Sequence, residues 1–139
     1  MTTDSVMTYF LVIVASVGII VALFFRFRYA LADLESKITG LWSNESNTMQ
    51  ILIYGMESRF QAVVVWTNDI DDKILGSGII RDMRLKYFNW GEGTYIDPFT
   101  RDQFKFKLKL KSTGRLHLQL FEKSSHLLLK VEEWKSVGR

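Results

Sequence analysis

QFKFKLKLKSTGRLHLQL, residues 103–120, alternates apolar and polar side chains along almost its whole length. Strict alternation is typical of a strand with one face on a core and one face in solvent. The apolar positions are Phe104, Phe106, Leu108 and Leu110, then Leu116, Leu118 and Leu120. Ser112-Thr113-Gly114 interrupts the pattern as a three-residue loop, with glycine where a left-handed residue is needed. The segment therefore predicts an antiparallel hairpin.

The alternation also fixes the register of this hairpin, because a slip of one residue would put lysines over the core. The expected facing pairs are Lys111 with Arg115, Leu110 with Leu116, Lys109 with His117, Leu108 with Leu118, and Phe106 with Leu120. The following strand is expected to point Leu127, Leu129 and Val131 inward. Glu132 would then lie near Arg115, as the expected acidic neighbour of the outer face, and Lys130 near His117.

The outer face of the hairpin carries a row of cations: Lys105, Lys107, Lys109, Lys111 and Arg115. One interpretation is a solvated face that discourages pairing with other chains. The other is contact with an anionic surface, either lipid headgroups or an acidic partner. Nucleic acid is not expected as a partner, because no exposed aromatic residues interleave with the lysines as stacking platforms.

Residues 49–135 form a single β domain by pattern. They hold about eight short runs rich in β-branched and aromatic residues, separated by turn signals such as Asn68-Asp69 and Asp97-Pro98. This spacing predicts a small all-β antiparallel domain, either a sandwich or a jelly-roll-like barrel. Residues 136–139 are expected to form a short C-terminal tail.

An uncharged apolar run occupies residues 6–25, after an N-terminal tail of residues 1–5. As a helix it would extend roughly 30 Å, the thickness of the hydrocarbon core of a bilayer. A buried core helix is disfavoured because this chain is too small to cover a helix that is apolar all round. A cleaved signal peptide is disfavoured because the run is long and no positive charge precedes it. We expect a single transmembrane helix.

Flanking charge predicts the orientation of this helix. Arg26, Arg28 and Lys37 follow the apolar run, whereas only Asp4 precedes it. The positive-inside rule places the N-terminus outside and the β domain on the cytoplasmic or mitochondrial matrix side. The glycosylation sequon at Asn44 points the other way, but such triplets often arise by chance.

Residues 26–42 have apolar residues at helical spacing, so we expect them to continue the membrane helix as an amphipathic juxtamembrane helix. A polar linker is expected to follow at residues 43–48. The apolar stripe of the juxtamembrane helix would pack on the β domain or on a partner helix; the stripe is Phe27, Leu31, Leu34, Ile38 and Leu41. Within the membrane, Ala15, Gly18 and Ala22 are small residues that allow close approach of another helix.

The sequence shows little sign of catalytic or metal chemistry. The 139 residues contain no cysteine, and the net charge of +3 is too small to argue for nucleic acid. His117 and His126 have no carboxylates at metal-ligand spacing, and the acidic loop of Asn68, Asp69, Asp71 and Asp72 lacks the order of an EF-hand. No catalytic residue, cofactor or metal is expected. Trp66, Trp90 and Trp134 are core residues or line a ligand groove.

These features predict a non-catalytic, single-pass membrane subunit of a larger membrane protein assembly. The partners would be other membrane subunits and the bilayer, including anionic headgroups. The alternative is a membrane-anchored β-sandwich binding module for anionic lipid headgroups, carbohydrate or an acidic partner. An enzyme is not expected, for want of a catalytic constellation.

Overall fold

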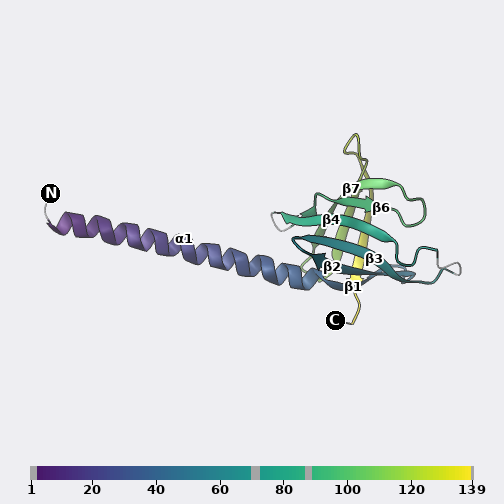
Figure 1. Cartoon of the computed structure of the whole chain (residues 1–139), viewed down its shortest axis with the longest axis horizontal. Helices are drawn as coiled ribbons and strands as arrows, with labels where there is room; N and C mark the ends of the chain where they lie inside the picture. Colours follow the sequence, from purple (N-terminus) through teal and green to yellow (C-terminus); the bar gives the residue numbers. More distant parts are fainter. Residues whose placement is uncertain (1–2, 70–72, 87–88, 139) are drawn as a thin grey trace. The chain divides into compact units, whose positions relative to one another are not determined.

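The computed structural model describes residues 3–69, 73–86 and 89–138. The chain divides into two units, Met1–Leu34 and Glu35–Arg139. The first contains most of one long helix, α1 (Thr3–Ile38), and the second is built of strands (Figure 1). The predicted acidic loop is only partly visible, because Asp71 and Asp72 lie outside the described residues.

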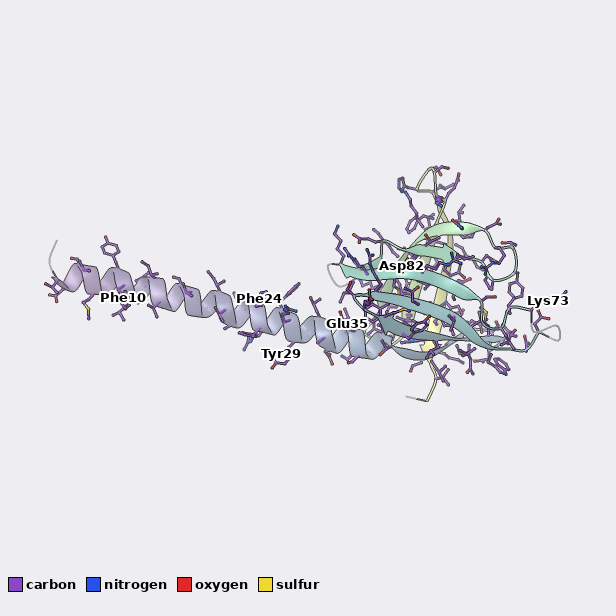
Figure 2. The ribbon with its side chains drawn as sticks, in the orientation of Figure 1. Phe10, Phe24, Tyr29, Glu35, Lys73 and Asp82 are labelled. Carbon is purple, nitrogen blue, oxygen red and sulfur yellow. The ribbon has the colours of Figure 1, made fainter. Side chains whose placement is uncertain are left out.

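Helix α1 is long and apolar enough to cross a membrane, and its apolar window is fully exposed in the isolated chain. Its aromatic side chains, among them Phe10, Phe24 and Tyr29, project outward from the ribbon (Figure 2). The hydroxyls in this stretch bond back to the helix: Ser16 Oγ donates to the Val12 carbonyl at 2.8 Å. Such bonds let a hydroxyl enter an apolar environment without losing its partner.

The helix ends four residues earlier than expected. Gly40 has a φ of 124°, a conformation that side-chain-bearing residues avoid, and it starts strand β1 (Gly40–Asn44). Trp42 Nε1 donates to the Ile38 carbonyl at 2.7 Å, which satisfies one of the orphan acceptors at the helix end. The predicted helix over 26–42 and linker over 43–48 are therefore wrong at their common boundary: residues 40–44 are a strand.

Within the described residues, nine strands form a closed antiparallel sheet. After β1 they are β2 (Met49–Met56), β3 (Arg59–Thr67), β4 (Gly78–Lys86), β5 (Asn89–Gly91), β6 (Thr94–Ile96), β7 (Gln103–Leu110), β8 (Leu116–Phe121) and β9 (Leu128–Ser136). The ring closes because β1 pairs with β9 and β3 pairs with β4. The predicted sandwich or jelly roll is wrong: a single sheet curls on itself into a barrel, and each strand has a neighbour on both sides over at least part of its length.

Strands β5 and β6 act as one interrupted strand, so the barrel has eight positions. Both pair with β4 on one side and β7 on the other. The interruption lies at Glu92 and Gly93, opposite Asp82, which has a φ of 56°. A Cβ on Gly93 would lie 1.9 Å from the Arg81 carbonyl oxygen, so only glycine allows the strands to approach here.

Large side chains fill the barrel. Trp42, Trp90 and Trp134 are all at most 2% exposed, and the Phe60 ring meets the Trp90 ring edge-on at 4.6 Å. Ile38, from the last turn of α1, is fully buried in the same core. The interior of the barrel is thus a packed core to which the helix end contributes.

The β7–β8 register is confirmed from Leu110 opposite Leu116 to Phe106 opposite Leu120, and next to the turn the Lys111 amide donates to the Arg115 carbonyl at 2.8 Å, as the expected Lys111–Arg115 pair requires. The connecting loop also behaves as expected, with Gly114 at a φ of 82°. The expected orientation of β9 is wrong by one residue. Trp134 faces inward opposite Leu116, which puts Lys130 and Glu132 on the inner side and Leu129 and Val131 on the outer side.

Candidate functional site

The barrel has two chemically different ends. We call the end where the chain enters at Gly40 the proximal end; the antiparallel order also puts the β2–β3, β4–β5 and β7–β8 turns and the end of β9 there. Its described cations are Lys37, Arg59, Lys86, Lys111, Arg115 and Lys135; Lys86 is paired with Glu92 and Lys111 with Glu133, and the β2–β3 turn holds Glu57. The opposite, distal end is less basic: its turns carry Glu45, Asp69, Asp97, Asp102 and Glu122 together with Lys73, Arg101 and Lys123. The barrel therefore has a basic proximal end.

The five predicted contact cations do not form one site. Lys107, Lys109 and Lys111 line an outer groove of about 420 Å³, together with Asn89, His117 and Gln119. Lys105 lies toward the distal end, where its Nζ is 3.4 Å from His126 Nε2. Since a strand rises about 3.3 Å per residue, Lys105 and Lys111 are roughly 20 Å apart along β7. At physiological salt this is about two Debye lengths, so one flat anionic surface at the proximal end would act only weakly on Lys105.

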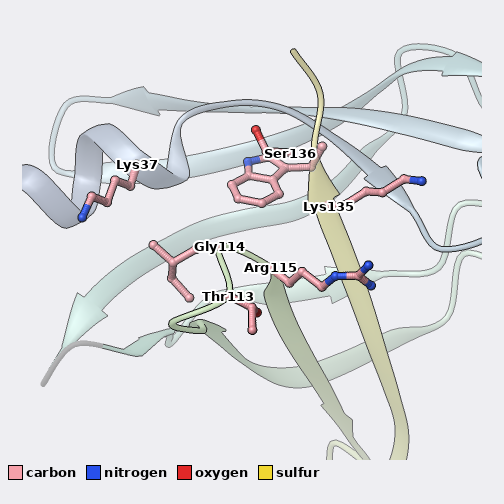
Figure 3. A pocket seen from close by; sticks show the side chains of 8 residues that line it. Lys37, Thr113, Gly114, Arg115, Lys135 and Ser136 are labelled. Atoms are coloured by element: carbon pink, nitrogen blue, oxygen red, sulfur yellow. The ribbon is translucent and has the colours of Figure 1, made fainter. Parts of the chain in front are cut away.

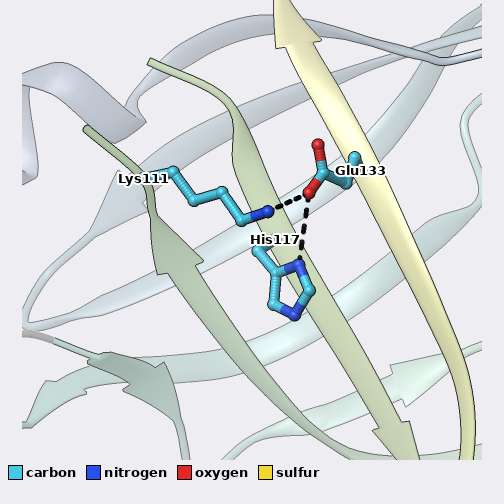
Figure 4. A network of polar contacts seen from close by, with 3 residues as sticks. All are labelled: Lys111, His117 and Glu133. Carbon is cyan, nitrogen blue, oxygen red and sulfur yellow. Dashed lines mark hydrogen bonds and ion pairs between the residues drawn. The ribbon is translucent and has the colours of Figure 1, made fainter. Parts of the chain in front are cut away.

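Glu133, rather than the predicted Glu132, is the acidic neighbour of the lysine row. Its carboxylate accepts a hydrogen bond from Lys111 Nζ and lies 3.4 Å from His117 Nδ1 (Figure 4). The Lys111 hydrogen bond, and then the contact with His117, hold the pKa of the Glu133 carboxyl below its usual value. The change of partner follows from the register, which places Glu133 outside, opposite His117.

A second depression, of about 340 Å³, opens at the proximal end (Figure 3). Three cations line it, Lys37, Arg115 and Lys135, around an apolar floor that includes Leu110 and Trp42. Arg115 therefore belongs to this depression and not to the groove of the other lysines. The sequence could not place Lys135 and Lys37 beside Arg115, because they come from β9 and from the last turn of α1.

The inner side of β9 near the distal end holds a charged pair. Lys130 Nζ lies 2.7 Å from Glu132 Oε1, and this hydrogen bond raises the pKa of the lysine. Burial, and then the negative charges of Glu132 and Asp97, raise the pKa of the Tyr95 phenol above its ordinary value of 10.0. These groups are an electrostatic cluster that sequence reasoning missed, because Glu132 and Lys130 were expected outside.

The outer side and margin of β9 form the most apolar exposed surface of the described barrel. Leu127, Leu128, Leu129 and Val131 are between 46% and 60% exposed. The backbone here is also open on one side. Of the residues in β9, only Trp134, Lys135 and Ser136 pair with β1. Among the described strands, residues 128–133 therefore have only β8 as a neighbour. The tip of the β8–β9 hairpin extends past its neighbours (Figure 1).

A groove of about 350 Å³ runs along this open margin. It lies between Asn44, Glu45, Ser46 and Met49 on one side and residues 130–134 on the other. The apolar residues 127–131 indicated a strand. Because three leucines follow one another, the sequence does not say which of them face the core, so neither the exposed side nor the open margin could be predicted. We call residues 128–133 the β9 edge.

The structure divides the predicted helix-packing residues as well. A Cβ added to Gly18 would meet nothing within 4 Å, and Phe27 is 47% exposed, whereas Ile38 is buried in the barrel. Leu41 lies in β1 and not on the helix. The predicted apolar stripe is therefore not one surface. Ile38, near its C-terminal end, packs in the β domain, whereas Phe27, at its N-terminal end, is exposed.

The tryptophans and the sequon are also assigned. Trp90 and Trp134 are core residues, while Trp66 is 43% exposed on the outside of β3.

Asn44 holds the β1–β2 turn: its Oδ1 accepts from the Thr48 amide at 2.9 Å, and its Nδ2 donates to Thr48 Oγ1 at 2.8 Å. A sugar on Nδ2 would replace one of the two N–H groups of the atom that donates to Thr48. Over residues 3–69, 73–86 and 89–138, no group of three metal-ligating side chains comes together.

Comparison with known proteins identifies the class of fold. The chain is similar to a solved structure described as protein HP1028 from the human pathogen Helicobacter pylori, which belongs to the lipocalin family. The TM-score is 0.57 at 11% sequence identity, over 73% of this chain and 83% of the other. This likeness shows a lipocalin-like barrel in place of the predicted sandwich. No protein-family model and no curated protein matches the sequence.

Proposed function

We propose that the chain is a non-catalytic, single-pass membrane protein whose barrel is a docking subunit of a larger membrane assembly. The observation that carries this proposal is the exposed apolar surface of β9. A small barrel that worked alone in water would gain by placing charges at Leu129 and Val131, which contribute nothing to its core. The packed interior supports the same view, because it leaves the outer surfaces to do the binding.

The proposed orientation puts the N-terminus outside and the barrel on the cytoplasmic or matrix side. Arg26 and Arg28 directly after the apolar run support it, as does the use of the Asn44 amide within its own turn. The chain has no cysteine, so Val65→Cys would provide one exposed thiol on the barrel. In sealed, right-side-out vesicles, we expect this thiol to react with an impermeant maleimide only after detergent is added. Reaction in intact vesicles would reverse the orientation.

The assembly role is tested by native electrophoresis of the full chain, taken from its own membrane in mild detergent, with mass spectrometry of the band. We expect migration in a large complex. Gly18→Ile is expected to release the chain, because it adds bulk on the small-residue face without a clash inside the chain. Ser16→Ile is the matched control, since position 16 lies roughly 160° round the helix from Gly18. Migration of the wild-type chain as a monomer or a dimer would refute the assembly role.

The basic proximal end favours a second candidate, contact with anionic lipid headgroups. Each lysine near such a surface contributes on the order of 1 kcal/mol, and the effect falls off within a Debye length. In bilayers with anionic lipid at low salt, we expect acylation of Lys111 and Lys135 to be slower than in zwitterionic bilayers, and high salt to remove the difference. Lys123, in the distal β8–β9 loop, is the internal control. Equal labelling in the two lipids would exclude the contact.

A further inference from the structure

We propose that the β9 edge pairs antiparallel with the β9 edge of a second copy of this chain, with Val131 on the two-fold axis. This inference rests on the proposed function only in taking β9 as a contact surface. It is independent of whether other subunits join the assembly.

The edge has the properties that strand addition requires. In an antiparallel ladder, alternate residues direct their N–H and C=O groups to each side of the strand. Within the β9 edge, half of these groups face β8 and the other half face the open side. An unpaired edge is a template for another strand, and this one also exposes Leu128, Leu129 and Val131. The groove beside residues 130–134 leaves room for one.

The side chains specify a second copy as the occupant. A two-fold axis perpendicular to the sheet lies midway between the two paired strands. One residue of the strand therefore lies directly opposite the same residue of the second copy. An axis at Lys130 would oppose two lysines, and an axis at Glu132 would oppose two glutamates. An axis at Val131 puts each Lys130 directly opposite the partner copy's glutamate at position 132. Only this register converts every like-charge contact on the inner face into an attractive one.

The outer face agrees with the same register. The two valines at position 131 would face each other. Each Leu129 would lie directly opposite Glu133 of the second copy and diagonally beside its valine, within side-chain reach. The four apolar side chains would cover one another; Leu129 and Val131 are 49% and 46% exposed in the single chain. Glu133 would not oppose the contact, because its carboxylate turns toward Lys111 and His117 on the neighbouring strands.

The test uses the absence of cysteine. Val131→Cys places one thiol on the proposed axis, where directly opposed side chains bring the two Cβ atoms to about 4.5–5.5 Å. Val65→Cys is the matched control, because Val65 is also a valine and is 41% exposed. The full-length variants are reconstituted separately in zwitterionic liposomes at low protein-to-lipid ratio, then treated with a mild oxidant or a short bifunctional thiol reagent. We expect a covalent dimer for Val131→Cys and little for Val65→Cys.

Charge reversal then tests the register. In the Val131→Cys background, Lys130→Glu or Glu132→Lys alone is expected to lower the dimer yield about tenfold, because both inter-chain pairs become repulsive. The double swap Lys130→Glu/Glu132→Lys restores the attraction and is expected to restore the dimer. The swap also restores the pair within each chain, so it controls for any loss of folding in the single variants.

The outcomes separate this inference from the assembly role. Equal cross-linking of the two cysteine variants overturns the β9 pairing, as does a double swap that folds but remains monomeric. A cross-link in native membranes to a chain of another mass, with no self-cross-link in liposomes, would give the edge to a different protein and also overturn it. A dimer in liposomes that migrates alone in native electrophoresis would support the pairing and refute the larger assembly.

Discussion

Strands β7 and β8 lie in the same continuous surface as strand β9, but the two regions divide their side chains in opposite ways. In β7 and β8 every leucine faces the core and the lysines face out. In the distal half of β9, Lys130 and Glu132 are on the inner side, and Leu129 and Val131 face solvent. The difference shows that the side of β9 that faces the core is set by its most deeply buried residue and not by the majority of its apolar residues.

That residue in β9 is Trp134. It lies where β9 has neighbours on both sides, β1 and β8, and it is 2% exposed. Burying about 150–250 Å² of a tryptophan stabilises the fold by roughly 4–6 kcal/mol. A one-residue slip would expose it and would place Glu133 and Lys135 at the same depth, at a cost of several kcal/mol for each charge. Burying Leu129 and Val131 would not offset this.

The largest effect is expected when this deciding residue is removed. Trp134→Ala should lower the free energy of unfolding by about 3–5 kcal/mol, from lost burial and the cavity left behind. Trp66→Ala, at a 43% exposed position, should lower it by about 1 kcal/mol or less. Urea unfolding of the full chain in detergent, followed by far-UV circular dichroism, measures both. Similar losses would mean that Trp134 does not set the β9 register.

Two leucines of the adjacent strands provide a finer comparison. Leu118→Ala on β8 should cost about 2–5 kcal/mol, because its side chain is 2% exposed. Leu129→Ala on β9 should cost about 0.5 kcal/mol or less in the monomer, because half of that side chain is already in water. The same unfolding experiment applies, at a protein concentration low enough to avoid self-association. A large loss for Leu129→Ala would place that residue in the core, as its sequence pattern predicts.

Alkaline pH tests the electrostatic cluster on the inner side of β9. Tyr95 has a raised pKa in the folded state, so its contribution to stability is complete below the unfolded value of about 10. That contribution is lost as pH rises beyond this value, because the unfolded chain releases the proton more readily. We expect the free energy of unfolding to fall more steeply above pH 10 for the wild-type chain than for Tyr95→Phe. Parallel pH profiles would mean that the phenol is not held neutral by its surroundings.

The smallest effect is expected on the outer face. The pKa of Glu133 is lowered in the folded state, so its pairing with Lys111 stabilises the barrel above the unfolded value of 4.5 and is lost as pH falls. Glu133→Gln should therefore be slightly less stable than wild type at pH 7, and the gap should close on acidification. Because the pair is partly exposed, salt should narrow the gap as well. A gap that persists at pH 3 would have another cause than charge.

Sequence patterns could predict the β7–β8 hairpin because residues 103–110 and 116–120 alternate apolar and polar side chains and a glycine marks the turn. They could not predict closure of the sheet, which depends on β1 pairing with β9 about 90 residues later. Residues 40–44 read as the end of a helical stripe because Leu41 falls at the right spacing. In the fold, Gly40 ends the helix, and the pairing of Trp42 with Ile51 and Ser136 takes the segment into the sheet.

The lysine row shows the same division between local and distant information. Its outward direction follows from the alternation of β7 alone. Its separation into a groove, a proximal depression and a distal lysine depends on Asn89, Lys135 and His126, which come from three other parts of the chain. The β9 edge depends on a difference in length between β1 and β9, which no local pattern records.

The Ile38–Trp42 junction determines where the protein can be divided. Ile38 belongs to the barrel core, and the Trp42 indole is bonded to the Ile38 carbonyl. A fragment that began at Asn47, within the predicted linker, would lack both the buried Ile38 side chain and strand β1. It would leave β2 and β9 as two new sheet edges and uncover Trp134. A form of the barrel without the apolar run therefore has to retain the last turn of helix α1 from Glu35, so the helix and the folded domain share residues that cannot be assigned to one alone.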